Sequence, residues 1–357
     1  ANLSLPEDIL LPADGIYASW TIINGVRHPS ATSIGVRPTF GLTLRVVEAY
    51  VIDYSGDLYG QKITVEFVRK LRDQETFADI PALVAQVGRD VTHLKEGDHA
   101  IVTWVPRTPV RGRPAALPSG ITYHEEPVHG STYTWGEDVL ISGDYVVPIP
   151  KDAPTDISCI VGCAVLTGAG AVLNTAKVRP GDSVAVYGVG GVGLCAIQMA
   201  AILEAYPIIA VDLTDEKLQL AQEFGATHMV NASKGDPVEA IQEITSGGVD
   251  YAFDAIGLKI TNEQILPSTR GGGPGADNHG GMAVLIGMPG KEMTIGPGLF
   301  MYHQPTFRGS LGATYPEKDF PMFLRWHQEG KFPLDKLVTR RYKLEQINEA
   351  CDALEAG

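Results

Sequence analysis

The stretch that decides the fold runs from Asp182 to Asp212, DSVAVYGVGGVGLCAIQMAAILEAYPIIAVD. A short β-rich apolar run opens it, and three glycines at GxGxxG spacing follow: Gly188, Gly190 and Gly193. The next apolar residues favour a helix, and a second apolar run ends on Asp212. A strand, a glycine-rich turn, a helix and a strand that ends on an acidic residue are typical of a dinucleotide-binding βαβ unit.

Each of these residues has a physical role in binding a dinucleotide. Gly188 permits a tight turn, Gly190 lets the backbone approach a pyrophosphate, and Gly193 lets helix and strand pack closely. The start of the helix presents free N–H groups and a positive dipole end to the phosphates. Asp212 accepts hydrogen bonds from both ribose hydroxyls of NAD and repels the 2′-phosphate of NADP. The sequence therefore predicts an NAD site.

Two other structures fit part of this stretch. One is a membrane-spanning helix, because only Gln198 is plainly polar between Val184 and Leu203. Four glycines within residues 188–193 argue against it, since each one lowers helix stability. The other is a core βαβ unit without a ligand. The acidic residue at the spacing of a nucleotide-binding unit favours the NAD site over both.

The composition limits the class of protein. A chain of 357 residues predicts two or three domains with sizeable cores. Its net charge of −14, without long runs of like charge, argues against nucleic acid or an anionic membrane as a partner. No signal peptide is visible, and no CxxC spacing or disulfide framework is found among Cys159, Cys163, Cys195 and Cys351. These features predict a cytoplasmic protein.

The first part of the chain is of a different kind. Residues 1 to about 90 carry β-branched runs with turn residues between them and no helix, which predicts an antiparallel barrel or sandwich. The pattern changes only at Phe77–Val91, which is predicted to be helical. The predicted strands are Gly15–Ile22, Arg27–Gly35, Leu44–Asp53 and Lys62–Leu71.

Four motifs in this part, DGIYASW, SIGVRPTFG, RVVEAYVIDYSGDLYG and VEFVRKLRDQETF, resemble the riboflavin kinase domain of bacterial flavin-making enzymes. The resemblance implies a β-barrel that binds ATP with Mg²⁺ and converts riboflavin to FMN. It also implies that Glu48 is the general base for the riboflavin hydroxyl. The family's Pro-Thr-Ala-Asn segment, which holds the phosphates and magnesium, is represented only from Ala1-Asn2 onward. We therefore expect most of the ATP-binding segment to be missing.

From the turn at Lys95–Asp98 to Gly357, the chain resembles the medium-chain, zinc-type alcohol dehydrogenases. The motif GCAVLTG, in a helix expected over 155–175, matches the family's G-C-x-x-x-T-G. The resemblance implies that Cys163 is a catalytic zinc ligand and that Thr167 contacts the nicotinamide. It also implies a partial GroES-like lobe, with strands at His99–Val105, Thr132–Ile141 and Asp144–Pro148.

Strands alternate with helices after this motif, which predicts a doubly wound parallel Rossmann sheet. A flexible surface insertion is expected at Arg270–Gly281, and a return to the catalytic lobe at Phe307–Tyr315. Helices are expected at Asp319–His327 and Leu344–Leu354. The motifs and the resemblance together assign cofactor contacts to Gly188, Gly190, Gly191, Val192, Gly193, Asp212, Lys217, Ile256, Gly257, Ile286, Gly287 and Met288.

The zinc ligands of the family are incomplete in this sequence. An early Cys and the His of a Gly-His-Glu motif would lie where the riboflavin kinase-like sequence stands, and no Gly-His-Glu occurs. One thiolate, Cys163, is too few for zinc, and His124 and His129 are loop histidines that stand as alternative ligands. Residues 107–120, in the place of the structural-zinc lobe, contain no cysteine.

The sequence thus predicts an α/β protein in four parts: a barrel at 1–90, a partial lobe at 91–150, a Rossmann domain at 151–300, and a return to the lobe at 301–357. The predicted function is NAD-dependent hydride transfer to or from a small alcohol or aldehyde, in a homo-oligomer. Two alternatives stay open: a riboflavin kinase, and a non-catalytic nucleotide-binding fusion or a sequence that is only part of its chain.

Overall fold

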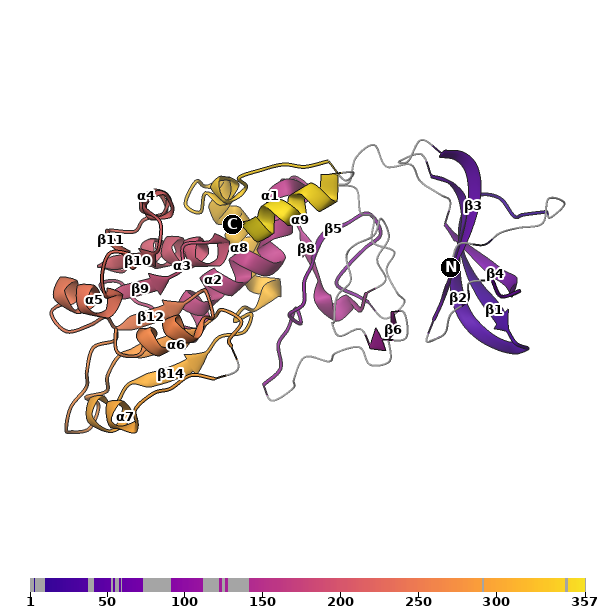
Figure 1. Cartoon of the computed structure of the whole chain (residues 1–357). Helices are drawn as coiled ribbons and strands as arrows, with labels where there is room; N and C mark the ends of the chain where they lie inside the picture. Colours follow the sequence, from indigo (N-terminus) through magenta and orange to yellow (C-terminus); the bar gives the residue numbers. More distant parts are fainter. Residues whose placement is uncertain are drawn as a thin grey trace. The chain divides into compact units, whose positions relative to one another are not determined.

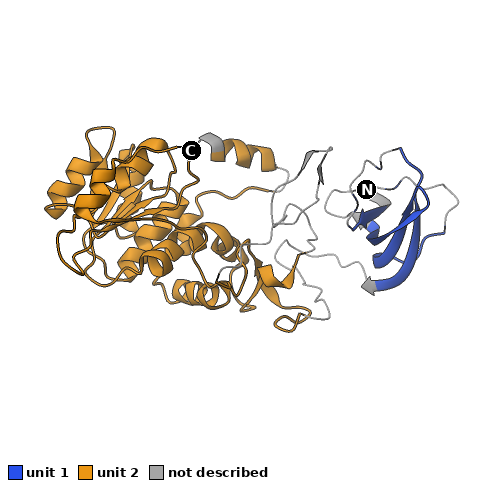
Figure 2. Cartoon of the chain, turned by 90° about the horizontal axis from the view of Figure 1, so that it is seen from below, with its two compact units in different colours: residues 1–82, 114–139 blue, residues 83–113, 140–357 orange. Residues whose placement is uncertain are grey.

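The computed structural model describes Leu3 and residues 10–37, 42–52, 54, 58, 60–72, 91–111, 122–123, 126–127, 141–290, 292–343 and 346–356. Contacts divide the chain into two compact units, residues 1–82 with 114–139 and residues 83–113 with 140–357 (Figure 2). The helix predicted at 77–91 and the strand predicted at 132–141 lie almost wholly outside the described residues. The domain boundaries near 150 and 300 stay predictions.

The first unit contains an antiparallel sheet in the order β3-β2-β1-β4 (Figure 1). Asn24 and Gly25, with φ of 50° and 79°, form the hairpin turn between the first two strands. Positive φ at both positions is what the Asn-Gly pair predicts. The described pairings leave this sheet open, with no pair that closes it into a barrel. The strands are β1 (Gly15–Ile23), β2 (Val26–Arg37), β3 (Leu42–Val51) and β4 (Thr64–Arg72).

Alternate residues of β1 are buried, as expected for a strand with one face on a core. Tyr17, Ile34 and Val47 form that core, and the ring of Phe67 packs edge-on to Tyr17 at 5.1 Å between centroids. Buried hydroxyls continue the same face and bond to one another: Ser19, Thr21, Ser30 and Thr32.

The second unit is built on a six-stranded parallel sheet in the order β11-β10-β9-β12-β13-β14. Counted from β9, this order is 3-2-1-4-5-6, so the strand order reverses between β9 and β12. Ligands of such sheets bind outside the carboxyl ends of the strands at that reversal. The strands are β9 (Val184–Tyr187), β10 (Ile208–Asp212), β11 (His228–Asn231), β12 (Tyr251–Asp254), β13 (Met282–Leu285) and β14 (Thr306–Gly309).

Helices cover both faces of this sheet (Figure 1). One hydrophobic cluster joins the sheet to α3 (Gly191–Ile202) and α4 (Asp215–Glu223). A second cluster joins the opposite side chains of the strands to residues of α5 (Pro237–Thr245) and α6 (Lys259–Ile265). The predicted doubly wound Rossmann fold is confirmed.

The helix predicted at 155–175 is confirmed as a continuous helical run, Thr155–Ala176. Two π-helical segments, η3 (Val161–Val165) and η4 (Ala171–Ala176), alternate in it with α1 (Thr155–Ile160) and α2 (Leu166–Gly170). Among the described residues it is the one helix long and apolar enough to cross a membrane, and 61% of its apolar window is buried. Its buried side chains belong to the same cluster as those of α3, as expected of a core helix.

The partial lobe packs on this helix. β5 (His99–Val102) pairs antiparallel with β8 (Val146–Ile149), which follows the short 3-10 turn η2 (Gly143–Tyr145). The strand expected at 99–105 ends at Val102. After it, the hydroxyl of Thr103 donates to the carbonyl oxygen of Gly162 at 3.1 Å. A further short pair, β6 (Thr122–Tyr123) with β7 (Glu126–Pro127), lies in the first unit.

The C-terminal part contains α7 (Pro297–His303), α8 (Pro316–Gln328), η5 (Leu334–Leu337) and α9 (Ile347–Ala356). The segment expected to return directly to the lobe first adds β14 to the sheet, beside β13. The return comes after that strand, where Gly312 lies against the lobe residue Trp104: a Cβ on Gly312 would lie 2.7 Å from the ring.

Candidate functional site

The glycine-rich turn lies at the carboxyl end of β9, next to the reversal in strand order. Gly188 has φ +90°, and a Cβ there would lie 2.4 Å from the side chain of Ile256. A Cβ on Gly193 would lie 1.8 Å from the carbonyl oxygen of Gly188. Since real Cβ atoms do not approach backbone so closely, Gly193 allows α3 to sit directly on the turn, as the sequence predicts.

The tip of the same turn is open. Gly190 and Gly191 are exposed, and a Cβ added to either would meet nothing within 4 Å. Gly190 is the N-cap of α3, without a capping side chain, and Val192 lies half-buried in the first turn of the helix. The first N–H groups of a helix have no partner within the helix, so this uncapped start can accept an anion such as a pyrophosphate.

Asp212, the last residue of β10, lies against the glycine-rich turn. Its Oδ2 accepts a hydrogen bond from the N–H of Val189 at 2.9 Å, and its Oδ1 accepts one from the N–H of Leu213 at 2.7 Å. A carboxylate has about four acceptor positions, so two stay available for ribose hydroxyls. These two bonds hold the carboxylate beside the turn, where the NAD prediction requires it.

Two further turns meet on the other side of the reversal, after β12 and β13. Gly257 has φ +90°, and a Cβ on it would lie 2.2 Å from the carbonyl oxygen of Met288. A Cβ on Gly287 would lie 2.4 Å from the N–H nitrogen of Gly257. Ile286 is buried, whereas Ile256 is 41% and Met288 82% exposed. The backbones thus pack against each other and leave two apolar side chains in the open.

The remaining predicted residues of this half occupy separate elements. Cys163 is exposed in η3, and one helical turn later the hydroxyl of Thr167 donates to its carbonyl oxygen at 2.7 Å. Lys217 is exposed on α4, whose N-terminus follows Asp212. A Cβ on Gly168 would lie 2.1 Å from the carbonyl oxygen of Val192, so this glycine brings the helix of Cys163 directly onto α3.

Glu48 belongs to the first unit. It is half-buried in β3 between the buried residues Val47 and Ala49. Its Cα lies opposite Ser33 of β2 in the sheet register. Since side chains alternate along a strand, Glu48 lies on the face away from the core of Tyr17 and Val47.

Comparison with known proteins gives a match for each part of the chain. A family profile described as "Zinc-binding dehydrogenase" matches residues 191–329, and one described as "Riboflavin kinase" matches residues 1–97. The chain is 32% identical over 309 residues to alcohol dehydrogenase 1 of Pisum sativum, with 77% of this chain and 78% of the pea protein covered. The chain belongs to the zinc-type alcohol dehydrogenase family.

Other members of the family give similar matches. Alcohol dehydrogenase class-3 of Cereibacter sphaeroides is 31% identical, covering 77% of this chain and 80% of that protein. The crystal structure of an alcohol dehydrogenase zinc-binding domain protein from Burkholderia ambifaria superposes with a TM-score of 0.66 at 32% identity, covering 76% and 78% of the two chains. Benzyl alcohol dehydrogenase from Acinetobacter calcoaceticus gives a TM-score of 0.62 at 28% identity, covering 76% and 78%.

The zinc that gives this alcohol dehydrogenase family its name does not fit the described residues. No group of three or more His, Cys, Asp or Glu side chains with metal-ligand geometry occurs in the part of the chain that the structure describes. Cys163 is an exposed free thiol, and His124 and His129 lie outside the described residues. A catalytic zinc takes three protein ligands and an open position, which one thiolate cannot supply.

Two thiols of the second unit have raised pKa values. Burial raises the pKa of Cys195, inside α3, to about 12. Burial also raises the pKa of Cys159, with the Asp156 carboxylate adding to the effect. Since the thiolate is the nucleophile and the metal ligand, neither of these cysteines is prepared for such a role at neutral pH.

The sequence motifs missed one residue at the edge of this site. Asp254 ends β12 and is completely buried, and its carboxylate accepts hydrogen bonds from the N–H groups of Ile256 and Gly257. The sequence did contain an indication of it: an acidic residue stands among the apolar residues of 251–257, before the glycine.

Proposed function

We propose that the chain is an NAD-dependent oxidoreductase that transfers hydride between a small alcohol or aldehyde and the nicotinamide. One observation carries the proposal. The Asp212 carboxylate is held by the N–H of Val189 against a glycine-rich turn whose tip is open. A carboxylate at this place selects the ribose of NAD and rejects the additional phosphate of NADP.

The residues divide the task of binding the cofactor. The N–H groups at the start of α3 bind the pyrophosphate, and Asp212 accepts from the hydroxyls of the adenosine ribose. The turns after β12 and β13 lie across the reversal in strand order and support the other half of the dinucleotide. Bound NAD supplies the hydride acceptor. Assignment to alcohols and aldehydes rests on family membership, supported by relatives that are named alcohol dehydrogenases.

Replacing Asp212 tests the proposal. Asp212→Arg removes the charged acceptor of the ribose hydroxyls. One hydrogen bond to a charged group is worth about 1.5–3 kcal/mol, so we expect NADH affinity to fall by at least about tenfold to a hundredfold. NADH fluorescence titration measures this, with NADPH as the second ligand. Asp215→Asn is the matched control, because Asp215 lies three residues away and bonds only surface groups, Asn231 and Lys234.

If the wild-type chain changes the fluorescence of neither nucleotide, the NAD proposal is wrong. Binding of NADH without oxidation of any alcohol, or reduction of any aldehyde, from a panel would instead identify a nucleotide-binding protein without catalysis. Equal loss of affinity in the Asp212 and Asp215 variants would remove the special role of Asp212.

The first unit supports a second proposed function, formation of FMN from riboflavin and ATP with Mg²⁺. The match of residues 1–97 to the riboflavin kinase family supports it. Phosphoryl transfer to an alcohol requires a carboxylate that takes the hydroxyl proton, and Glu48 is the predicted base. Its half-exposed position in β3 leaves the carboxylate within reach of a ligand.

Chromatographic detection of FMN tests this function. We expect Glu48→Gln to lower the rate by about 10²–10⁴-fold, the usual contribution of a general base. Glu66→Gln on β4 is the control, since Glu66 forms an exposed ion pair with Arg27. If the Glu66 variant loses as much activity as the Glu48 variant, or if no FMN forms at high protein concentration, the kinase assignment is wrong.

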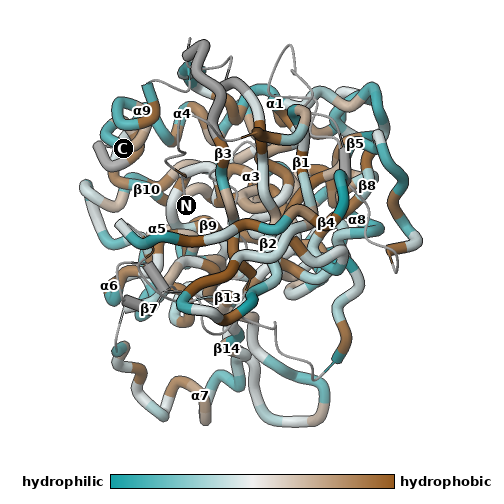
Figure 3. The backbone as a smooth tube through the Cα atoms, turned by 90° about the vertical axis from the view of Figure 1, so that its right-hand side faces the viewer, coloured by the Kyte–Doolittle hydropathy of each residue, from teal (hydrophilic) through white to brown (hydrophobic). Residues whose placement is uncertain are grey.

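We also propose a homo-oligomer in the cytoplasm. β14 is the edge of the parallel sheet, and α7 lies beside it in two views of the chain (Figure 1 and Figure 3). Phe300, Met301 and Tyr302 of α7 have exposed fractions of 41%, 75% and 76%. An edge strand beside a helix with exposed apolar side chains favours self-association. Light scattering of Met301→Asp against the wild type tests it. A wild type that is monomeric at micromolar concentration contradicts it.

A further inference from the structure

Asp254 is an acidic residue that is completely buried and has no cationic side chain among its described hydrogen-bond partners. It is the last residue of β12, at the carboxyl end of the sheet, and its exposed fraction is 0%. A buried carboxylate is costly unless hydrogen bonds compensate for lost water. The bonds that Asp254 makes therefore show what its charge stabilises.

All four donors to the carboxylate are neutral. Oδ1 accepts from the N–H groups of Ile256 at 2.8 Å and Gly257 at 3.0 Å. Oδ2 accepts from the side-chain amide of Asn262 and, at 2.8 Å, from the hydroxyl of Thr261, whose one proton is shared with the carbonyl oxygen of Leu258 at 3.0 Å. Thr261 and Asn262 belong to α6 and are themselves buried. One carboxylate thus joins the turn after β12 to the helix that follows it.

The backbone of the same residue holds the neighbouring turn. The carbonyl oxygen of Asp254 accepts from the N–H groups of Ile286 at 2.9 Å and Gly287 at 2.8 Å. These backbone bonds continue the pairing of β12 with β13. The carboxylate itself therefore fixes the turn at 256–257, and the turn at 286–287 packs against it. These are the turns whose glycines leave no room for a Cβ, at 2.2 Å for Gly257 and 2.4 Å for Gly287.

The two turns lie at the end of the sheet where the nicotinamide half of a dinucleotide is expected. A dinucleotide crosses the carboxyl ends of such a sheet at the reversal in strand order. Asp212 is on the β10 side and takes the adenosine ribose, so the nicotinamide half extends over β12 and β13. The side chain of Ile256 also contacts the glycine-rich turn, since a Cβ on Gly188 would lie 2.4 Å from its Cγ1.

We propose that Asp254 is a positioning residue for the nicotinamide half of the cofactor, acting through the turns at 256–257 and 286–287. This inference rests on the proposed NAD function. Asp254 does not touch the cofactor itself, because it is fully buried. The negative charge is needed because both oxygens accept two bonds, whereas an amide in its place presents N–H groups to donors.

Two ligands separate this role from a general contribution to stability. Isothermal titration of NADH reports on the whole site, and ADP-ribose reports on the adenosine half alone. We expect Asp254→Asn to weaken NADH by about tenfold and to change ADP-ribose affinity by less than about twofold. The matched control is Asp250→Asn, which changes a partly buried aspartate directly before the same strand and for which both affinities stay at the wild-type values.

Thr261→Val is a milder second variant that removes one donor to Asp254 and keeps the side-chain volume. We expect about threefold weaker NADH binding with ADP-ribose unchanged, and this variant decides the matter if Asp254→Asn does not fold. Unchanged NADH affinity, or an equal loss for both ligands, overturns the positioning role while leaving NAD binding intact. A wild type that binds neither ligand overturns the proposed function and this inference with it.

Discussion

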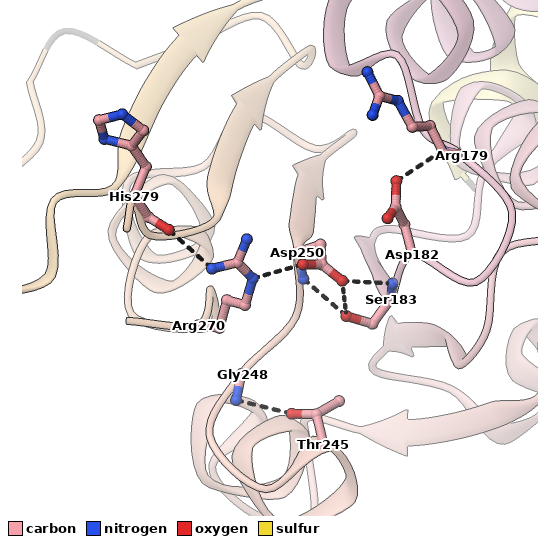
Figure 4. Close-up of polar contacts among 8 residues, drawn as sticks. All are labelled: Arg179, Asp182, Ser183, Thr245, Gly248, Asp250, Arg270 and His279. Carbon is pink, nitrogen blue, oxygen red and sulfur yellow. Dashed lines mark hydrogen bonds and ion pairs between the residues drawn. The ribbon is translucent and has the colours of Figure 1, made fainter. Parts of the chain in front are cut away.

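Both ends of the parallel sheet carry aspartates that accept hydrogen bonds from the backbone, but only those at the carboxyl end lie at the proposed cofactor site. At the carboxyl end, Asp212 and Asp254 hold backbone N–H groups of turns that stand open to solvent. At the amino end, Asp250 accepts from the N–H and hydroxyl of Ser183 at 2.9 and 2.8 Å and from Arg270 at 2.6 Å (Figure 4). A carboxylate that accepts hydrogen bonds from a turn is therefore not enough by itself to indicate a ligand-binding site.

The difference lies in what surrounds each carboxylate. Arg270 also donates to the carbonyl oxygen of His279 at 2.8 Å. The hydrogen bonds at the amino end therefore include the segment 270–281. Backbone bonds from Gly272 to His303 and from Gly280 to Gln304 anchor the same segment, which was expected to be a flexible insertion. At the carboxyl end, the exposed Gly190 and Gly191 leave room for a ligand.

The largest effect is expected at Gly193. Gly193→Ala places a Cβ 1.8 Å from the carbonyl oxygen of Gly188, so the turn must move. We expect a loss of about 3 kcal/mol in the free energy of unfolding, at the upper end for overpacking, together with loss of NADH binding. Urea denaturation and NADH titration measure the two.

Gly190→Ala is the matched control, since a Cβ there meets nothing within 4 Å. It should weaken NADH binding without lowering the unfolding free energy. If both variants have the same free energy of unfolding, the close contact between Gly193 and Gly188 does not contribute to stability.

A smaller effect is expected at Asp250. Burial alone would raise the pKa of Asp250, but hydrogen bonds from Arg270 and Ser183 outweigh it and lower the pKa below its ordinary value. A lowered pKa stabilises the fold above the unfolded-state pKa of about 3.9 and loses this contribution as pH falls through the folded pKa. Asp250→Asn should therefore cost about 1–2 kcal/mol at neutral pH and less near pH 3.

Urea denaturation at several pH values measures this cost. NADH affinity should stay unchanged, because the residue lies at the end of the sheet away from the proposed site. A clear fall in NADH affinity for this variant would abolish the distinction between the two ends.

The smallest effect is expected at Lys217, an exposed residue on α4 at the carboxyl end. Exposed charges contribute about 0.2–1 kcal/mol, so Lys217→Ala should weaken NADH by less than about fivefold, and by less still at high salt. Lys234→Ala is the control, because its ammonium already pairs with Asp215 at 2.6 Å. Equal effects of both variants at every salt concentration would show that Lys217 makes no specific contact.

Local patterns were enough for much of the second unit. The run Asp182–Asp212 predicts a strand, turn, helix and strand, and the structure places them as β9, the glycine turn, α3 and β10. These elements depend on residues close in sequence: glycine where φ is positive, β-branched residues in strands, and apolar residues in the helix. The Asn24–Gly25 hairpin of the first unit was predictable for the same reason.

Contacts between distant segments were not predictable in this way. The pairing of Thr306–Gly309 with β13 and the bond between Asp250 and Ser183 each join residues far apart in the chain. Nothing in the strand pattern of residues 249–257 distinguishes Asp254, whose carbonyl meets the turn at 286–287, from Asp250 at the strand's start. Both are acids beside apolar residues.

The sequence by itself determined the dinucleotide-binding unit and the resemblance of the first 90 residues to riboflavin kinases, because spacing and residue type carry that information. Only the tertiary structure decided which carboxylates lie at the open end of the sheet and which glycines have no room for a side chain. The physical reason is that packing and the burial of charge depend on neighbours that the chain brings together only when it folds.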